Sequence, residues 1–369
     1  MKIAVVIPKY GLTGGAEGFA KALTERLALQ NGFEIHVFAN RYRRGAAPVI
    51  FHHVPILRFP RFMRQISFAF FADKQIQRGQ FDRVHSHDRI FRMHFLTMHG
   101  IPHARWIRHA RNKRLSLFDK SMSWVERKGL DSPDLRMVLP VSSLVKDELL
   151  QTYSIPEHRL QVVHPGISEE RFISPDRERC RRLVRERHGI SGTDVVALFV
   201  GMNFEIKRLG RVMEGLAHVA GGNPGAAGLK LLVAGKGDIA HYQSLARGLG
   251  ILDRVVFVGV AKEVETYCFA SDFFVMPSVF DTFGMAVLEA MAAGLPVIIT
   301  QKVGARDLVR DGVSGFILDE NPGPRYLGRT MARLLKPEQR TRMGAEARKT
   351  ALQHTWGRVA DQMAAILKT

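Results

Sequence analysis

Short apolar runs alternate with longer amphipathic segments along almost the whole chain. Apolar runs of about 4–8 residues bounded by turn residues are typical of buried parallel strands, whereas apolar positions three and four residues apart are typical of helices. The first predicted helix, residues 14–30, has an apolar face made of Ala16, Phe19, Ala20, Leu23 and Leu27. The predicted strands of the first half are residues 2–8, 34–39, 83–86, 137–141 and 161–164. This alternation predicts an α/β fold with parallel sheets.

A polar, arginine-rich stretch, residues 168–192, interrupts the alternation once. We interpret its start as a hinge and predict a charged helix at residues 176–188. A surface loop is predicted at residues 221–228. The predicted strands of the second half are residues 195–201, 229–235, 255–259, 273–277, 297–300 and 316–318. The second half is therefore predicted to be a second α/β domain.

The most informative segment is residues 278–297. After the predicted strand at 273–277 comes a loop with one carboxylate, Asp281, and then a helix with a second, Glu289, before Gly294 and Pro296 end the helix. Strand, loop and helix in this order direct the free backbone N–H groups of residues 283–286 at the carboxyl edge of the sheet. These donors and the helix dipole favour a bound anion.

This segment resembles the Glu-x7-Glu signature of the retaining nucleotide-sugar glycosyltransferases of the GT-B fold (glycosyl transferases group 1, family four). The resemblance implies that Asp281 contacts the donor sugar and that Glu289 binds the ribose hydroxyls. The backbone amides that would hold the diphosphate are those of Phe283, Gly284 and Met285. The first acid is Asp where the family has Glu, so its side chain is one methylene shorter.

The same resemblance implies two Rossmann-like domains facing a cleft. Residues 1–167 would form an N-terminal, acceptor-binding domain, and residues 168–354 a C-terminal domain that binds the nucleotide sugar. The last helix, within residues 355–369, would cross back to the first domain.

Two glycine loops lie between a predicted strand and the following helix. The loop at residues 11–17 contains Gly14 and Gly15, which let a ligand approach the backbone; a purely structural role is equally compatible with glycines there. This loop resembles the Gly-Gly-Ala-Glu loop of many family members, which implies donor binding.

The second glycine loop follows Gly201 and leads to Lys207 near a helix start, where an anion would offset an unfavourable cation. A solvated surface lysine is the alternative. The resemblance implies that Lys207 stabilises the leaving diphosphate. Arg208 is expected to assist, because Met202 stands where many members carry arginine.

The segment 96–100 resembles the family segment whose histidine lies beside the donor sugar, which implies that His99 hydrogen-bonds the sugar. Gly235 and Val260 follow strands of the second half and, by resemblance, line the pocket for the nucleotide base. His87 and Asp88 could suggest a metal site with His85, but we interpret them as satisfied residues at the end of a strand.

The chain contains no Asp-any-Asp triplet, which metal-dependent diphosphate enzymes generally need. We therefore expect no metal and no other cofactor. Retention at the anomeric carbon follows from the resemblance alone, with departure and attack on the same face.

The formal net charge is +19, from 54 basic and 35 acidic residues, which predicts an anionic partner. Residues 101–128 contain eight Arg or Lys and two acids, with apolar residues at helical spacing: Leu115, Phe118, Met122 and Val125. A basic amphipathic helix suits an anionic membrane surface, although a core-facing helix with solvated arginines has the same pattern. A second basic cluster comprises Arg41, Arg43, Arg44, Arg58, Arg61 and Arg64.

The basic region resembles the membrane-interacting insertion of bacterial lipopolysaccharide-core glucosyltransferases. The resulting hypothesis is a hexosyltransferase that moves glucose from UDP-glucose to a lipopolysaccharide-core or related glycolipid acceptor. It would work in the cytoplasm, peripherally on the inner membrane. Cys180 and Cys268 lie too far apart in the sequence for a disulfide framework. We expect no signal peptide at the start of the chain. No apolar run reaches the roughly 20 residues of a membrane span.

Two other functions are compatible with parts of the pattern. A nucleic-acid-binding protein would use the positive charge, but the chain has no nucleic-acid motif and its anion loops suit one diphosphate better than a polymer, so we expect no nucleic-acid partner. A transferase-like protein that has lost activity is compatible with Asp281 in place of Glu. A Rossmann dehydrogenase is disfavoured because the glycines of the first loop lack the Gly-x-Gly-x-x-Gly spacing.

Overall fold

The computed structural model describes residues 1–12, 14–110, 114–173, 176–222 and 228–369, with only the backbone of 109–110. Most of the predicted loop at 221–228, Thr13 of the first glycine loop and residues 111–113 of the basic segment lie outside the described residues. Within the described residues, no helix is long and apolar enough to span a membrane.

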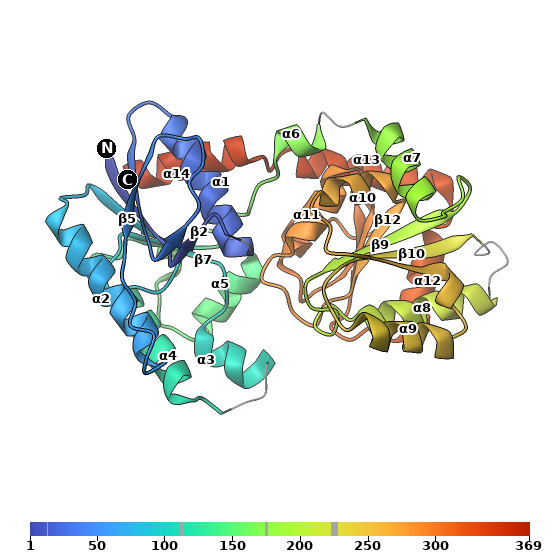
Figure 1. Cartoon of the computed structure of the whole chain (residues 1–369), viewed down its shortest axis with the longest axis horizontal. Coiled ribbons are helices and arrows are strands. Elements are labelled where there is room, and N and C mark those ends of the chain that lie inside the picture. Colours follow the sequence, from blue (N-terminus) through green and yellow to red (C-terminus); the bar gives the residue numbers. More distant parts are fainter. Residues whose placement is uncertain (13, 111–113, 174–175, 223–227) are drawn as a thin grey trace. The chain divides into compact units, whose positions relative to one another are not determined.

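The chain divides into two compact units. Unit 1 comprises Met1–Gly166 and Trp356–Thr369, and unit 2 comprises Ile167–Thr355. Each unit is built on a six-stranded parallel sheet (Figure 1). The α/β architecture with two Rossmann-like domains is therefore confirmed.

The sheet of unit 1 has the strand order β5-β3-β1-β6-β7-β8. Its strands are β1 (Lys2–Val6), β3 (Glu34–Ala39), β5 (Val49–His53), β6 (Arg83–Ser86), β7 (Phe95–Met98) and β8 (Met137–Pro140). A small parallel pair, β2 (Lys9–Tyr10) and β4 (Arg41–Tyr42), extends from it. The sequence pattern did not predict β5 or β7. Residues 161–164 are not a strand, but Gln161 N–H donates to the Val138 carbonyl (3.1 Å).

The longer helices of unit 1 are α1 (Gly15–Leu29), α2 (Met63–Arg78), α4 (Leu117–Leu130), α5 (Ser143–Leu150) and α14 (Trp356–Lys368). Shorter turns are α3 (His103–Arg105), the π-helix η1 (Trp106–Ala110) and the 3-10 helix η2 (Glu157–Arg159). The last helix, α14, packs against α1: the rings of Phe19 and Trp356 lie 5.1 Å apart, edge to face. The predicted return of the C-terminal helix to the first domain is thus confirmed (Figure 1).

The sheet of unit 2 has the order β11-β10-β9-β12-β13-β14. Its strands are β9 (Val195–Gly201), β10 (Leu229–Gly235), β11 (Val255–Gly259), β12 (Phe273–Met276), β13 (Val297–Thr300) and β14 (Gly315–Leu318). Its helices are α6 (Glu169–Phe172), α7 (Arg177–Arg187), α8 (Leu209–Gly222), α9 (Ile239–Gly248), α10 (Val264–Ala270), α11 (Met285–Ala292), α12 (Pro324–Arg333) and α13 (Pro337–Ala351). The 3-10 turns η4 (Leu252–Arg254) and η5 (Gly304–Leu308) complete it. The continuous apolar runs form strands because both faces of the sheet are covered by helices.

Both sheets have the same doubly wound strand order, in which the first strand lies between the second and the fourth. In such sheets the connections leave in opposite directions on the two sides of the first strand, so a crevice opens at the carboxyl ends of the first and fourth strands. These switch points are the ends of β1 and β6 in unit 1 and of β9 and β12 in unit 2. A ligand-binding site is therefore expected at these two places.

Candidate functional site

The switch point of unit 2 is held together by hydrogen bonds between the loops after β9 and β12. Val279 N–H donates to the Ile206 carbonyl (2.9 Å), and the Ser278 hydroxyl donates to the same oxygen (3.1 Å). The two loops are therefore fixed in register. As a result, the side chains of the residues that follow, Lys207 and Asp281, face each other.

Lys207 and Asp281 form an ion pair between Nζ and Oδ2. Each side chain is 18% exposed, so the pair is neither sealed nor fully solvated. The backbone of Asp281 is anchored on both sides, because its N–H donates to the Lys302 carbonyl (2.9 Å) and its carbonyl accepts from Gly304 N–H (2.9 Å). The structure thus brings together two of the three residues predicted to be catalytic.

The start of α11 lies beside this pair. Gly284, at its N-cap, has a φ of 89° and provides no side-chain cap. A Cβ there would lie 3.0 Å from the Val303 side chain and 3.3 Å from the Asp281 carboxylate, which places that carboxylate at the helix start. Phe283 is buried and its carbonyl accepts from Ala305 N–H, so the turn before Met285 is rigid. An uncapped helix start with an ammonium beside it is suited to an anion.

Glu289 lies one turn further along α11. Its side chain is 17% exposed, and its Oε1 is 3.9 Å from the guanidinium of Arg171, which itself pairs with Glu265. Burial raises the pKa of Glu289 to about 7, partly opposed by the charge of Arg171. The carboxyl group is therefore close to half protonated at neutral pH and remains reachable from solvent.

The glycines at the strand ends of unit 2 allow close packing that a larger residue would prevent. Gly235 pairs with Gly201 across β9 and β10, and a Cβ at Gly235 would lie 1.7 Å from the Gly201 carbonyl oxygen. A Cβ at Gly201 would lie 2.9 Å from the stem of Lys207. These glycines let the strand ends and the Lys207 stem approach one another, whether or not a ligand is bound.

Two residues predicted for donor binding lie apart from the ion pair. Arg208 adopts a φ of 58° and donates to the carbonyl of Glu320, while Lys207 contacts Asp281. Of the two residues expected to stabilise the diphosphate, Lys207 and Arg208, it is Lys207 that pairs with Asp281 in this structure. Val260 follows Gly259 at the end of β11 and is exposed, so its side chain is open to a ligand.

In unit 1, His99 belongs to a stack of imidazoles. Its Nε2 is hydrogen-bonded to Nδ1 of His87 (3.0 Å), and its ring lies edge-on to Phe19. Burial lowers the pKa of His99 to about 3, with a smaller contribution from His85. The imidazole is neutral at physiological pH, so it is suited to a hydrogen bond and not to carrying a proton.

A cavity of about 250 Å³ lies at the switch point of unit 1. His87 is 5% exposed and lines it, and its buried Nε2 has no partner among the described residues. The interpretation of His87 as a satisfied strand-end residue thus applies to Nδ1, which is hydrogen-bonded to His99, and is wrong for Nε2. The polar residues lining the cavity are Lys9, Glu17, Arg64, Gln65, His87 and Asp88.

The sequence analysis did not name Lys9 or Gln65 as site residues, and it named Arg64 only as a member of the second basic cluster. Lys9 comes directly after the first predicted strand, residues 2–8, and that position at a switch point was the available signal. Arg64 and Gln65 come from α2, whose first turn reaches the cavity. No local motif marks them.

The start of α1 is less open to an anion than the glycine loop suggests. Gly14 has a φ of 156°, and a Cβ there would lie 2.0 Å from the carboxylate of Glu17. Glu17 therefore folds back over the loop and places negative charge at the helix start. Gly14 permits this fold-back, whereas a Cβ at Gly15 would meet no neighbouring atom, and a diphosphate would have to displace the carboxylate.

Of the basic segment, residues 117–128 belong to α4, which begins with a capping box between Ser116 and Asp119. Its predicted apolar face points into the protein: Val125 is fully buried, and Phe118 and Met122 line the cavity of unit 1. That face is therefore not available to a membrane. Other apolar side chains are exposed instead, with Leu117 at 70% and Trp124 at 48%.

Comparison with known proteins identifies relatives over both halves of the chain. The model described as Glycosyltransferase Family 4 matches residues 13–171, and the one described as Glycosyl transferases group 1 matches residues 181–350. EpsD of Bacillus subtilis (strain 168), which is named as a glycosyltransferase, is 28% identical over 91% of this chain and 89% of its own.

Solved structures show the same fold. WaaG, a glycosyltransferase involved in lipopolysaccharide biosynthesis, superposes with a TM-score of 0.83 at 20% identity, covering 99% of each chain. HepE of Anabaena, solved in complex with UDP-glucose, has a TM-score of 0.74 at 16% identity, covering 100% of this chain and 99% of its own.

Proposed function

Because the chain belongs to the group 1 glycosyltransferases and has the GT-B fold, we propose that it transfers a hexose, with retention, from a nucleotide diphosphate sugar to a glycolipid acceptor. UDP-glucose is the proposed donor, and a lipopolysaccharide-core or related glycolipid is the proposed acceptor. The solved complex of HepE with UDP-glucose and the fold shared with WaaG support these choices.

The observation that carries the proposal is the Lys207–Asp281 pair at the uncapped start of α11. A diphosphate bound there would accept hydrogen bonds from the amides of residues 283–285 and would attract the Lys207 ammonium. Asp281, released from its cation, would accept hydrogen bonds from sugar hydroxyls. Glu289, further along the same helix, would accept those of the ribose, with Gly201, Gly235 and Val260 beside the nucleotide. No metal is needed in this scheme, because Lys207 and the helix start supply the positive charge.

In the proposed reaction the bond between the anomeric carbon and the diphosphate oxygen breaks, and the bond to the acceptor oxygen forms on the same face. The acceptor hydroxyl proton passes to the departing phosphate oxygen. Lys207 stabilises the charge that develops on the diphosphate. His99, being neutral, holds a sugar hydroxyl by one hydrogen bond.

The cavity of unit 1 is the proposed acceptor subsite. Its polar lining combines two cations, Lys9 and Arg64, with two acids, Glu17 and Asp88, and with Nε2 of His87, which has no partner in the part of the chain that the structure describes. Cations suit the phosphates of a lipopolysaccharide core, and acids and imidazole suit sugar hydroxyls. We further propose peripheral attachment to the cytoplasmic face of the inner membrane through the exposed Leu117 and Trp124 and the basic residues around them.

Donor binding and turnover test this proposal separately. A thermal-shift panel of UDP, GDP and ADP and their sugars should single out one nucleotide, because a ligand at a hundredfold excess over its Kd stabilises by about 2.7 kcal/mol. Release of glucose from UDP-glucose without acceptor should then be measurable. Donor binding without hydrolysis or transfer would favour the alternative of an inactive, transferase-like protein, and no stabilisation by any nucleotide sugar would contradict the proposal.

A further inference from the structure

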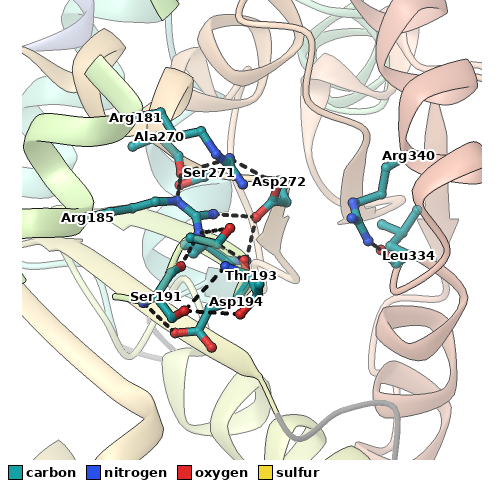
Figure 2. Close-up of polar contacts among 12 residues, drawn as sticks. Arg181, Arg185, Ser191, Thr193, Asp194, Ala270, Ser271, Asp272, Leu334 and Arg340 are labelled. Carbon is teal, nitrogen blue, oxygen red and sulfur yellow. Dashed lines mark hydrogen bonds and ion pairs between the residues drawn. The ribbon is translucent and has the colours of Figure 1, made fainter. Parts of the chain in front are cut away.

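Unit 2 contains a second, larger cavity whose lining is dominated by arginine. Its volume is about 550 Å³, and the guanidinium groups that line it are those of Arg177, Arg181, Arg340 and Arg348. They come from α7 and α13, two helices that are far apart in sequence. Figure 2 shows Arg181 and Arg340 on opposite sides of the space, with Arg185 below Arg181 in this view.

This cavity is distinct from the Lys207–Asp281 site. Asp272, which lines it, immediately precedes β12, and Gly294 precedes β13. It therefore lies at the amino edge of the parallel sheet, whereas Lys207 and Asp281 follow the carboxyl ends of β9 and β12. The two sites are at opposite edges of the same sheet.

The arginines have an ordinary structural role that accounts for only part of their hydrogen-bonding capacity. Arg177 Nη1 donates to the Ala293 carbonyl (3.4 Å), and Arg348 Nη1 donates to that of Ala292, so both contact the C-terminal end of α11. Arg340 uses Nη1 for the carbonyls of both Leu334 and Leu335 (2.8 Å each), at the end of α12. Cations at helix C-termini are favourable. Each guanidinium has five N–H donors, however, and among the described residues Nε and Nη2 of Arg177 and Arg340 have no partner.

Carboxylates do not balance this charge. Asp272 contacts Arg181 (3.2 Å) and Arg185 (2.9 Å) at once and also accepts from Val196 N–H. Among the described residues, no carboxylate is within ion-pair distance of Arg177, Arg340 or Arg348. The other acid lining the cavity, Glu178, is exposed at its rim. Partial burial lowers the pKa of Arg177, with a smaller contribution from the neighbouring Arg181.

We infer that this arginine-lined cavity binds a phosphate-bearing small molecule or headgroup at a site separate from the sugar-transfer site. Guanidinium groups whose paired N–H donors are unused match the geometry of phosphate oxygens. Four guanidinium groups around one space supply more N–H donors than a single chloride ion would need. The volume of about 550 Å³ exceeds that of one phosphate, so the space accommodates a ligand larger than phosphate alone. Because the lining carries an excess of positive charge, the ligand is expected to be negatively charged. This site does not depend on the identity of the proposed sugar donor or acceptor.

The test uses pyrophosphate as the probe, in the full-length chain. Titration calorimetry at constant ionic strength is carried out on the wild type and in a Lys207→Ala background, where any binding at the α11 start is weakened. We expect pyrophosphate binding to persist in the Lys207→Ala background and to weaken at least tenfold when Arg177→Gln and Arg340→Gln are added. Arg182→Gln, an exposed arginine of α7 outside the cavity, should leave binding unchanged.

Because Arg340 also caps α12, Arg177→Gln alone provides the cleaner variant, and thermal melting verifies that each variant is folded. Vesicles containing phosphatidic acid separate the two sources of the phosphate group. Vesicle binding that is lost in Arg177→Gln identifies a lipid headgroup, and pyrophosphate binding without vesicle binding identifies a soluble ligand; either supports the site. Pyrophosphate binding that is absent in the Lys207→Ala background, or unchanged by both arginine substitutions in folded protein, overturns it.

Discussion

Lys207 Nζ and Asp281 Oδ2 are in direct contact, so the first loop of unit 2 and the loop before α11 are closed on each other by opposite charges. The pair holds two charged side chains of that unit that we propose act on the reacting sugar and the diphosphate. Ligand binding must exchange this contact for contacts with the donor. The pair is thus a resting arrangement in which each charge satisfies the other.

Replacing Lys207 by alanine should reduce turnover more than donor affinity. The ammonium stabilises charge that grows as the diphosphate departs, and removing one such group costs about 100-fold or more in kcat. Transfer kinetics with saturating donor provide the measurement, and Lys262→Ala, an exposed lysine of the same unit, is the control. A variant with unchanged kcat and a raised KM would show that Lys207 only binds the donor.

Glu289→Gln should make the protein more stable at pH 8 and no different at pH 4. The pKa of Glu289 is raised by burial from 4.5 to about 7. The folded state therefore holds this proton more tightly than the unfolded state does, and stability falls as pH rises from 4.5 to 7. A shift of this size is worth on the order of 3 kcal/mol, which glutamine avoids. Thermal melts at both pH values provide the measurement, with the exposed Glu186→Gln as control.

The same substitution should weaken donor binding, because an ionised carboxylate accepts hydrogen bonds from ribose hydroxyls more strongly than a neutral amide does. Donor affinity of the wild type should accordingly increase as pH rises through 7, and that increase should vanish in Glu289→Gln. Calorimetric titration at pH 6 and pH 8 tests both statements. Equal donor affinity for the two proteins at pH 8 would remove Glu289 from the site.

Gly235→Ala should destabilise unit 2 strongly. The new Cβ would lie 1.7 Å from the backbone oxygen of Gly201, at a φ of 133°, and a backbone atom cannot move aside as a flexible side chain can. We expect a loss of more than about 3 kcal/mol or failure to fold. Gly248→Ala, at the end of α9 with open space around it, should be neutral. Denaturant unfolding compares them.

Arg64→Gln should raise the KM for acceptor without changing donor hydrolysis. Arg64 lines the cavity of unit 1, where its charge is available to an acceptor phosphate. A tenfold or greater rise in acceptor KM is expected, since a charged hydrogen bond contributes about 1.5–3 kcal/mol. Lys74→Gln removes a charge from the same helix, outside the cavity, and should leave KM unchanged. A parallel loss of donor hydrolysis would indicate that Arg64 does not act on the acceptor.

Leu117→Ser combined with Trp124→Ser should reduce binding to anionic vesicles; Leu117 is exposed, whereas Trp124 also packs on Phe91, so thermal melting must verify that the variant is folded. Leu29→Ser, an exposed leucine on α1, serves as the matched control. Sedimentation with phosphatidylglycerol vesicles measures the difference. If both variants bind vesicles as the wild type does, the membrane surface of unit 1 lies elsewhere.

The alternation of apolar and amphipathic segments was sufficient for most of the fold. Strands such as 34–39 and 195–201 have the predicted bounds. The missed strand β5 (Val49–His53) lies at the sheet edge and is half exposed, with two histidines that break the apolar run. Its strand character comes from pairing with β3, a tertiary effect that local pattern does not contain.

The site was predictable where one segment carries it, and less so where separate segments meet. The residues on α11 follow from one stretch of sequence. The contact between Lys207 and Asp281 depends on hydrogen bonds from residues 278–279 to Ile206, which no spacing indicates. The direction of α4 was also beyond the pattern, because an amphipathic period shows that one face is covered and does not show by what.

Unit 2 begins and ends at one point: Ile167 bridges to Thr355, and Ile167 N–H donates to the His354 carbonyl (2.9 Å). It is therefore an insertion within unit 1, which needs the last 14 residues to complete its own helical layer. Deleting the C-terminal tail would damage the half of the protein most distant from it in sequence. Excising residues 167–355 as a single stretch would instead cut the polypeptide at two positions that lie next to each other in space. Unit 2 is therefore the natural candidate for separate expression.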